Sequence, residues 1–70
     1  MKTWERDSYT VVEVPFDGDL HEFQIVKGEE VIATITPATI EDMKIITKDL
    51  DNGKDVNGWE DGMGNTISIL

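Results

Sequence analysis

Cysteine is absent from the 70 residues, histidine occurs once, and six Lys and Arg stand against fifteen Asp and Glu. Without cysteine the protein has no disulfide, no thiolate nucleophile and no Cys-ligated zinc site, which fits a reducing cytoplasm. No apolar run approaches the length of a transmembrane helix, and the charged stretch at 1–7 does not resemble a signal peptide. We therefore expect a cytoplasmic protein that does not bind membranes.

The shortage of cations leaves a formal net charge of −9. A negative field of this size repels phosphates, so direct binding to nucleic acid is not expected, and suitable partners carry neutral or basic surfaces. The length fits one small domain over residues 1–70, expected to be a monomer or a weak homo-oligomer. Size and charge alone suggest an accessory protein of a bacterium or a phage.

Alternating apolar residues predict two antiparallel strands, Thr10–Phe16 and His21–Lys27. Their apolar faces are formed by Val12, Val14 and Phe16 in the first strand and by Phe23 and Ile25 in the second. A loop of even length, such as 17–20, places these faces opposite each other, whereas an odd loop would bury polar groups. Pro15 cannot donate to a ladder, so the first strand should end there or lie at an edge of the sheet.

A third strand is predicted at Val31–Thr36, with Val31, Ala33 and Ile35 on its apolar face. Matching this face to the second strand requires an odd turn, which we expect to have three residues with Gly28 at positive φ. The last residues, 66–70, alternate again and predict a short final strand.

An amphipathic helix is predicted from Pro37 to Asp51. Thr36 is a suitable N-cap, Pro is favoured at the first helical position, and Asn52-Gly53 is a typical stop. The apolar stripe consists of Ile40, Met43, Ile46 (or Thr47) and Leu50. Ion pairs at i, i+3 are expected for Glu41–Lys44 and Lys48–Asp51.

The predicted order is therefore β-β-β-α-β, an α+β two-layer sandwich in which one helix packs on one face of a mostly antiparallel sheet. The expected core consists of Val12, Val14, Phe23, Ile25, Val31, Ile35, Ile40, Met43, Ile46, Leu50 and Ile67.

Groups suited to catalysis are scarce. His21 lies near the start of a predicted strand, where we expect a half-exposed cross-strand partner of Phe16 rather than a general base. Neither serine is linked to it by sequence pattern. We expect no enzymatic activity and no cofactor.

Residues 49–60 match an EF-hand calcium loop at five positions, Asp49, Asp51, Asp55, Val56 and Glu60. However, Gly53 falls where an oxygen ligand is needed, and Lys54 falls where the tight turn needs glycine. We therefore assign no metal ligand, and cation binding by the Asp49–Glu60 loop remains the third functional hypothesis.

The most distinctive segment is the glycine-rich stretch 57–65. The candidate partner-binding residues in it are Trp59, Met63, Glu60 and Asp61, because Trp and Met side chains carry much of the energy of protein interfaces. The alternative is that Trp59 folds back and closes the open end of the sandwich. Trp4, near the other end of the chain, poses the same question.

The first functional hypothesis is thus a small acidic, non-enzymatic binding or regulatory module that acts through a protein partner. The alternative is an acidic inhibitor that mimics nucleic acid. That alternative needs acids gathered on one face, and the expected carriers outside the helix layer are Glu13, Glu22, Glu29 and Glu30. Lys44 and Lys48 interrupt the acids of the helix, which argues against mimicry there.

Overall fold

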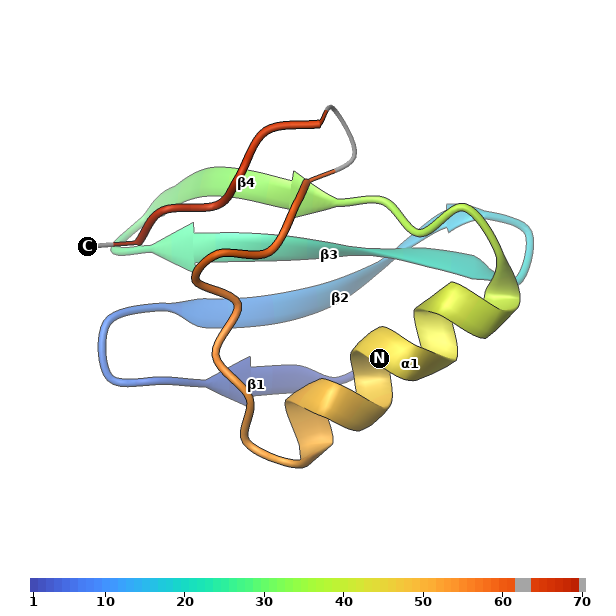
Figure 1. Cartoon of the computed structure of the whole chain (residues 1–70), viewed down its shortest axis with the longest axis horizontal. Coiled ribbons are helices and arrows are strands. Elements are labelled where there is room, and N and C mark those ends of the chain that lie inside the picture. The colour runs from blue at the N-terminus through green and yellow to red at the C-terminus, as the bar shows by residue number, and fades with distance from the viewer. Residues whose placement is uncertain (62–63, 70) are drawn as a thin grey trace.

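The computed structural model describes residues 1–61 and 64–69. Its elements are β1 (Thr3–Glu5), β2 (Thr10–Asp17), β3 (Leu20–Lys27), β4 (Glu30–Ile35) and α1 (Ile40–Asp51). The four strands form one antiparallel sheet in chain order, β1-β2-β3-β4 (Figure 1). The α+β class is confirmed.

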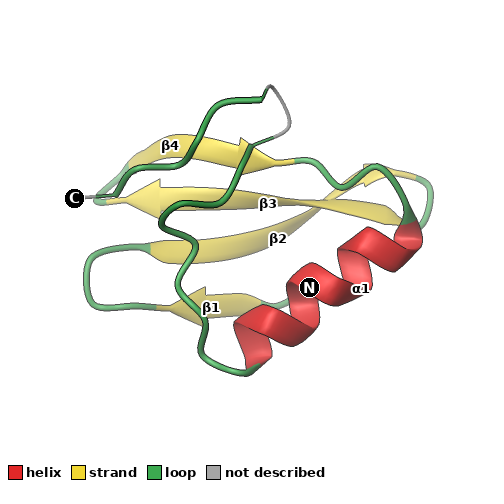
Figure 2. Ribbon diagram, viewed as in Figure 1, coloured by secondary structure: helices red, strands yellow, loops and turns green. Residues whose placement is uncertain are grey.

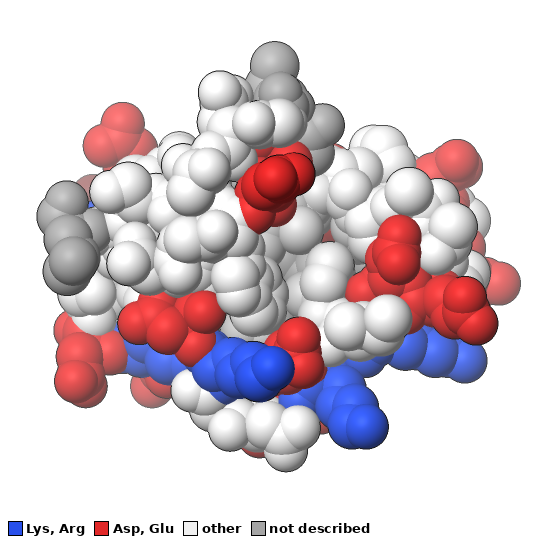
Figure 3. All heavy atoms as spheres, in the orientation of Figure 1, with Lys and Arg blue, Asp and Glu red and all other residues white. Residues whose placement is uncertain are grey.

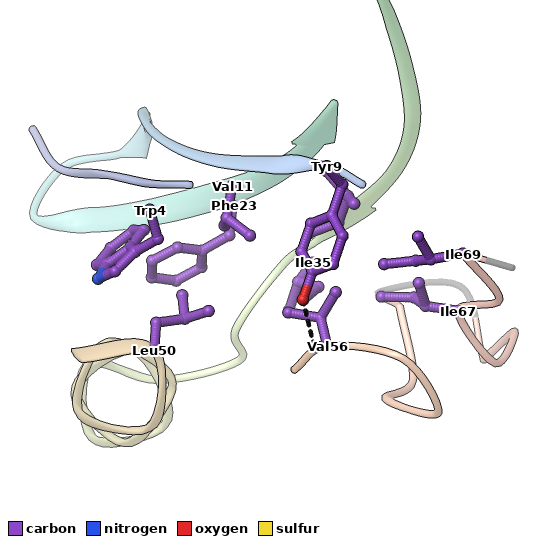
Figure 4. Packing of buried hydrophobic residues seen from close by; sticks show 10 residues of the cluster. Trp4, Tyr9, Val11, Phe23, Ile35, Leu50, Val56, Ile67 and Ile69 are labelled. Carbon is purple, nitrogen blue, oxygen red and sulfur yellow. Dashed lines mark hydrogen bonds between the residues drawn. The ribbon is translucent and has the colours of Figure 1, made fainter. Parts of the chain in front are cut away.

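The helix and the C-terminal segment (residues 54–61 and 64–69) lie on the same face of the sheet (Figure 2). Figure 4 shows how they share the core: Trp4 and Phe23 point toward Leu50 of α1, while Tyr9 and Ile35 point toward the C-terminal segment. The buried apolar side chains among the described residues are Trp4, Tyr9, Val11, Phe23, Ile25, Ile35, Leu50, Val56, Ile67 and Ile69.

The predicted order β-β-β-α-β is wrong at both ends of the chain. An additional strand, β1, precedes the others and contributes the buried Trp4. The predicted final strand is replaced, over 64–69, by irregular chain with one isolated bridge between Glu60 and Thr66, and Leu70 lies outside the described residues. Ile67 and Ile69 of this segment nevertheless reach the core.

The register of the β2–β3 hairpin differs from the prediction. The turn does have an even length, with Gly18-Asp19 between the paired Asp17 and Leu20, but the ladder is irregular between Pro15 and Asp17. There β2 carries one extra residue, Phe16, and such a bulge reverses the alternation of all residues beyond it. Val11 therefore lies opposite Ile25.

The same combination of a tight turn and a bulge shapes the β3–β4 hairpin. The turn has two residues, Gly28-Glu29, instead of three, and the ladder is irregular beside Ile32. The expected match of the faces is confirmed, since Ile35 pairs with Phe23 and Ala33 with Ile25. Gly18 and Gly28 both have positive φ, 56° and 66°, at the first turn position, as type II′ hairpin turns require.

These bulges decide which predicted core residues are correct. Five of them are confirmed as buried, namely Phe23, Ile25, Ile35, Leu50 and Ile67. Two more, Met43 and Ile46, are half-buried and pack against the core. The prediction of a core position is wrong for the other four, Val12, Val14, Val31 and Ile40. Val12 and Val14 lie on the sheet face away from the helix and are partly buried. Val31 is 48% exposed because it pairs with Val26 beyond the bulge.

Helix α1 starts three residues later than predicted, at Ile40. Thr39 is the N-cap, and its side-chain oxygen accepts a hydrogen bond from the Asp42 amide at 3.1 Å. Thr36, the predicted cap, instead donates its hydroxyl to Glu22 Oε2 at 2.8 Å. The predicted stop at Asn52 is confirmed, since Asn52 is the C-cap.

Substitution of two neighbouring valines tests the observed β2–β3 register directly. Val11→Ala removes methyl groups from a site with no exposure and should lower the free energy of unfolding by about 2 kcal/mol. Val12→Ala acts on the opposite, solvent-facing side and should cost less than about 1 kcal/mol. Urea denaturation of both variants measures the difference, and a larger loss for Val12→Ala would contradict the observed register.

Candidate functional site

The candidate partner-binding residues of the glycine-rich stretch 57–65 differ in their surroundings. Trp59 is half-buried and packs against the core, which fits the alternative in which its ring closes the end of the core. Glu60 is exposed, and Met63 lies outside the described residues. The Asp61 carboxylate accepts the Asn65 amide at 2.9 Å, and the Asp61 amide donates to the Asn65 carbonyl at 2.8 Å. Partner binding by these four residues stays a prediction.

A different part of the molecule is hollowed. A groove of about 620 Å³ lies between α1 and the residues that lead into β1, and it opens to solvent. Met1 and Met43 contribute its apolar surface, and Glu13 and His21 line it from the sheet. A volume of this size suits the binding of several side chains or a small ligand. This α1 groove is the candidate functional site.

Glu13 and His21 form a hydrogen-bonded pair in the groove. His21 Nδ1 lies 2.8 Å from Glu13 Oε2, while Glu13 Oε1 accepts the Lys2 amide at 3.0 Å. The Glu13 side chain is only 11% exposed and that of His21 27%. Two expectations are therefore wrong: His21 pairs with Pro15 rather than Phe16, and Glu13 lies on the helix-covered face, opposite Phe23. The bulge in β2 causes both changes.

The surroundings of Glu13 favour its charged form. Burial is the largest single influence and opposes ionisation, but the hydrogen bonds from His21 and the Lys2 amide, with the charge of a protonated His21, outweigh it. The pKa of Glu13 is therefore below its ordinary value. When His21 is neutral and donates from Nδ1 to this carboxylate, Nε2 is left as a hydrogen-bond acceptor.

Met43 is held in place by a contact with His21. Its Sδ atom accepts the backbone amide of His21 at 3.3 Å, which ties α1 to the start of β3. The Thr47 hydroxyl, one turn further along the helix, donates to the Met43 carbonyl at 3.0 Å. The position of Met43 in the groove is thus fixed by contacts from β3 and from α1 itself.

Three of the six cationic side chains line the α1 groove, namely Lys2, Lys44 and Lys48. Lys2 Nζ lies 3.0 Å from Asp51 Oδ2. Within the described part of the chain, Lys44 and Lys48 form no ion pair or side-chain hydrogen bond, so the predicted pairs Glu41–Lys44 and Lys48–Asp51 are wrong. The Lys and Arg atoms visible in Figure 3 gather along the lower part of the view, over which α1 runs in Figure 1.

Asp51 is occupied by other partners. Its Oδ1 atom accepts the Trp4 indole Nε1–H at 2.8 Å, beside the Lys2 ammonium. The hydrogen bond from Trp4, followed by that from Lys2, lowers the pKa of Asp51 below its ordinary value. This carboxylate therefore joins β1 to the end of α1 and forms no ion pair with Lys48.

The acids of the Asp49–Glu60 segment are directed to separate partners. Asp49 belongs to α1 and lies 3.5 Å from Lys54 Nζ. Asp55 Oδ1 accepts the Tyr9 hydroxyl at 2.8 Å and the Asn57 amide at 2.9 Å. These bonds, the Asn57 amide first, lower the pKa of Asp55, while burial raises the pKa of Tyr9. Residues 1–61 and 64–69 hold no group of three His, Asp or Glu side chains that suits a metal ion.

Comparison with known proteins adds no relative, since the chain matches no family model, no curated protein and no solved structure. None of the helices in the described residues is long and apolar enough to cross a membrane.

Replacement of Glu13 tests whether the Glu13–His21 pair stabilises the fold. A carboxylate with a lowered pKa stabilises the fold above its unfolded-state pKa of about 4.3, and this contribution disappears as pH falls through the folded value. Glu13→Gln should therefore lower the free energy of unfolding by about 1–2 kcal/mol near pH 6. The difference from the parent chain should shrink toward zero below about pH 4. Urea denaturation at several pH values measures it.

The matched control for this experiment is Glu29→Gln in the exposed β3–β4 turn, which should leave stability nearly unchanged at every pH. A Glu13→Gln effect of constant size from pH 3 to pH 7 would show that the charge of Glu13 contributes nothing.

We predict that the Asp49–Glu60 segment does not bind calcium with useful affinity. Calcium needs six to eight oxygens around one point, whereas Asp51 and Asp55 are turned toward Trp4 and Tyr9 on the sheet. A calcium titration at physiological salt, followed by backbone amide shifts, checks this. Saturable shifts confined to residues 51–60 with sub-millimolar affinity would contradict it.

Proposed function

We propose that the chain is a small non-enzymatic binding module that acts through a protein partner, and that the partner docks in the α1 groove. The observation that supports this most is the groove itself, which combines the apolar side chains of Met1 and Met43 with Lys44 and Lys48, two lysines that form no ion pair within the described residues. Methionine side chains adapt to the shape of a bound segment, and they are frequent at protein-binding surfaces.

The order of the groove supports binding as well. Lys2 fixes Glu13, Glu13 fixes His21, and the His21 amide fixes Met43, so each wall is held before a partner arrives. Binding to a surface that is already ordered loses less conformational entropy than binding to a loose one. The chain of contacts therefore favours a preformed docking site.

The same contacts argue against nucleophilic catalysis in the groove. The Glu13–His21 pair has the form of an oriented base, and a nucleophile within hydrogen-bond reach of the imidazole would complete such a site. The hydroxyl that lines the groove is that of Thr47, and it donates to the Met43 carbonyl within its own helix. We therefore assign the pair a positioning role in the wall of the groove.

Site-specific photocrosslinking tests the proposal. A photoreactive residue at position 52, the exposed C-cap of α1, lies on the groove and leaves its lysines in place, whereas the same residue at position 45 replaces an isoleucine that is 57% exposed on α1. In a lysate of the source cells, position 52 should capture a defined protein that position 45 does not. A third probe at Glu60 tests the glycine-rich tip.

Capture from neither helix position but from position 60 would move the docking site to the tip. Equal capture from positions 52 and 45 would contradict specific docking in the groove. Reproducible turnover of a substrate that is lost in His21→Gln would overturn the non-enzymatic assignment.

A further inference from the structure

We propose that the α1 groove binds an acidic segment of the partner protein, whose carboxylates pair with Lys44 and Lys48 while an apolar side chain covers Met1 and Met43. This inference rests on the proposed function and specifies the chemistry of the segment that docks.

The charged groups that line the groove do not neutralise one another completely. Its two carboxylates are already engaged, Glu13 by His21 and the Lys2 amide, and Asp51 by Trp4 and Lys2. The positive charges of Lys44 and Lys48 are thus left without a neutralising group in the described chain, although fifteen acids are present in the sequence. A ligand that brings carboxylates supplies what this surface lacks.

The spacing of the lysines suits two carboxylates of one segment. Lys44 and Lys48 stand one helical turn apart, with Cβ atoms about 6 Å from each other. In an extended peptide, side chains two residues apart lie on the same side, roughly 7 Å from each other. Alternating acids along an extended segment therefore meet both ammonium groups.

The net charge of −9 does not prevent this contact. At physiological ionic strength the Debye length is about 8 Å, so charges elsewhere on the chain are largely screened while a salt bridge at contact distance is not. The overall charge instead repels partners that are acidic over their whole surface. The expected partner carries an acidic segment on an otherwise neutral or basic surface.

The test is a titration of the full chain, labelled with nitrogen-15, at physiological salt. The probe is a short blocked peptide of alternating Glu and Leu, and its neutral twin has Gln at every Glu position. The acidic peptide should cause saturable amide shifts at His21 and along residues 43–48, and the neutral twin should bind about tenfold more weakly.

A matched pair of variants separates local from general charge. Lys48→Gln should weaken the acidic peptide roughly threefold, and the double variant Lys44→Gln, Lys48→Gln about tenfold. Lys54→Gln removes the same charge from a side chain that is 61% exposed outside the groove, and it should have no effect. Lys48→Arg should retain binding because it retains the charge.

Equal affinity for the acidic and neutral peptides would overturn this inference and leave the groove as a binding site. An equal loss in Lys48→Gln and Lys54→Gln would also overturn it, because attraction would then be general. Inorganic phosphate that produces the same shifts as the peptide would show a simple anion site. Failure of both peptides would reject the acidic segment, whereas failure of the crosslink at position 52 would reject docking in the groove altogether.

Discussion

One face of a four-stranded sheet has to be buried, and the chain has a single twelve-residue helix to bury it. A helix of this length spans roughly 18 Å, too little to cover the whole face. Leu50 of α1 packs over the Trp4 and Phe23 end, and the C-terminal segment brings Val56, Ile67 and Ile69 to the other (Figure 4). The fold depends on this division of one core between a helix and an irregular chain.

The irregular C-terminal segment is held to the sheet by side-chain hydrogen bonds that a paired strand would not need. The Tyr9 hydroxyl donates to Asp55 and accepts the Val56 amide at 3.0 Å. Lys27 Nζ donates to the Ile69 carbonyl at 3.0 Å, and the Asn57 side-chain oxygen accepts the Ile69 amide at 3.1 Å. Because such a segment lacks a continuous ladder, these side chains satisfy backbone groups that would otherwise be buried without partners.

Local signals were enough to predict where the chain turns between the strands and where the helix ends, since each depends on residues adjacent in sequence, although the β3–β4 turn is one residue shorter than predicted. The face of β2 was not predictable in this way. Val11 and Val12 are both suited to a core, and the register that buries Val11 also places Glu13 on the covered face. Burial of the Glu13 carboxylate is tolerated because His21 pairs with it across the sheet. This contact forms only in the folded chain and cannot be seen in the sequence pattern.

The candidate site was missed for the same reason. The four-residue spacing of Lys44 and Lys48 is visible in the sequence, but Glu41 and Asp51 stand at the i, i+3 positions that were expected to neutralise them. Only the fold shows that Trp4 and Lys2 take up Asp51. Trp4 itself lies in a strand of three residues, which is too short to produce a readable alternation.

The brevity of β1 has a consequence for how long the groove exists. Met1 and Lys2 form one wall, and the strand that holds them pairs with β2 over only three residues, Thr3 to Glu5. Short terminal strands open by local unfolding at a much lower free energy than the core of a domain. Each opening of β1 would remove this wall, free the Glu13 carboxylate from the Lys2 amide and release Asp51 from Trp4. The lifetime of the groove is therefore that of β1 on the sheet, and amide exchange of Trp4 and Glu13 reports on both.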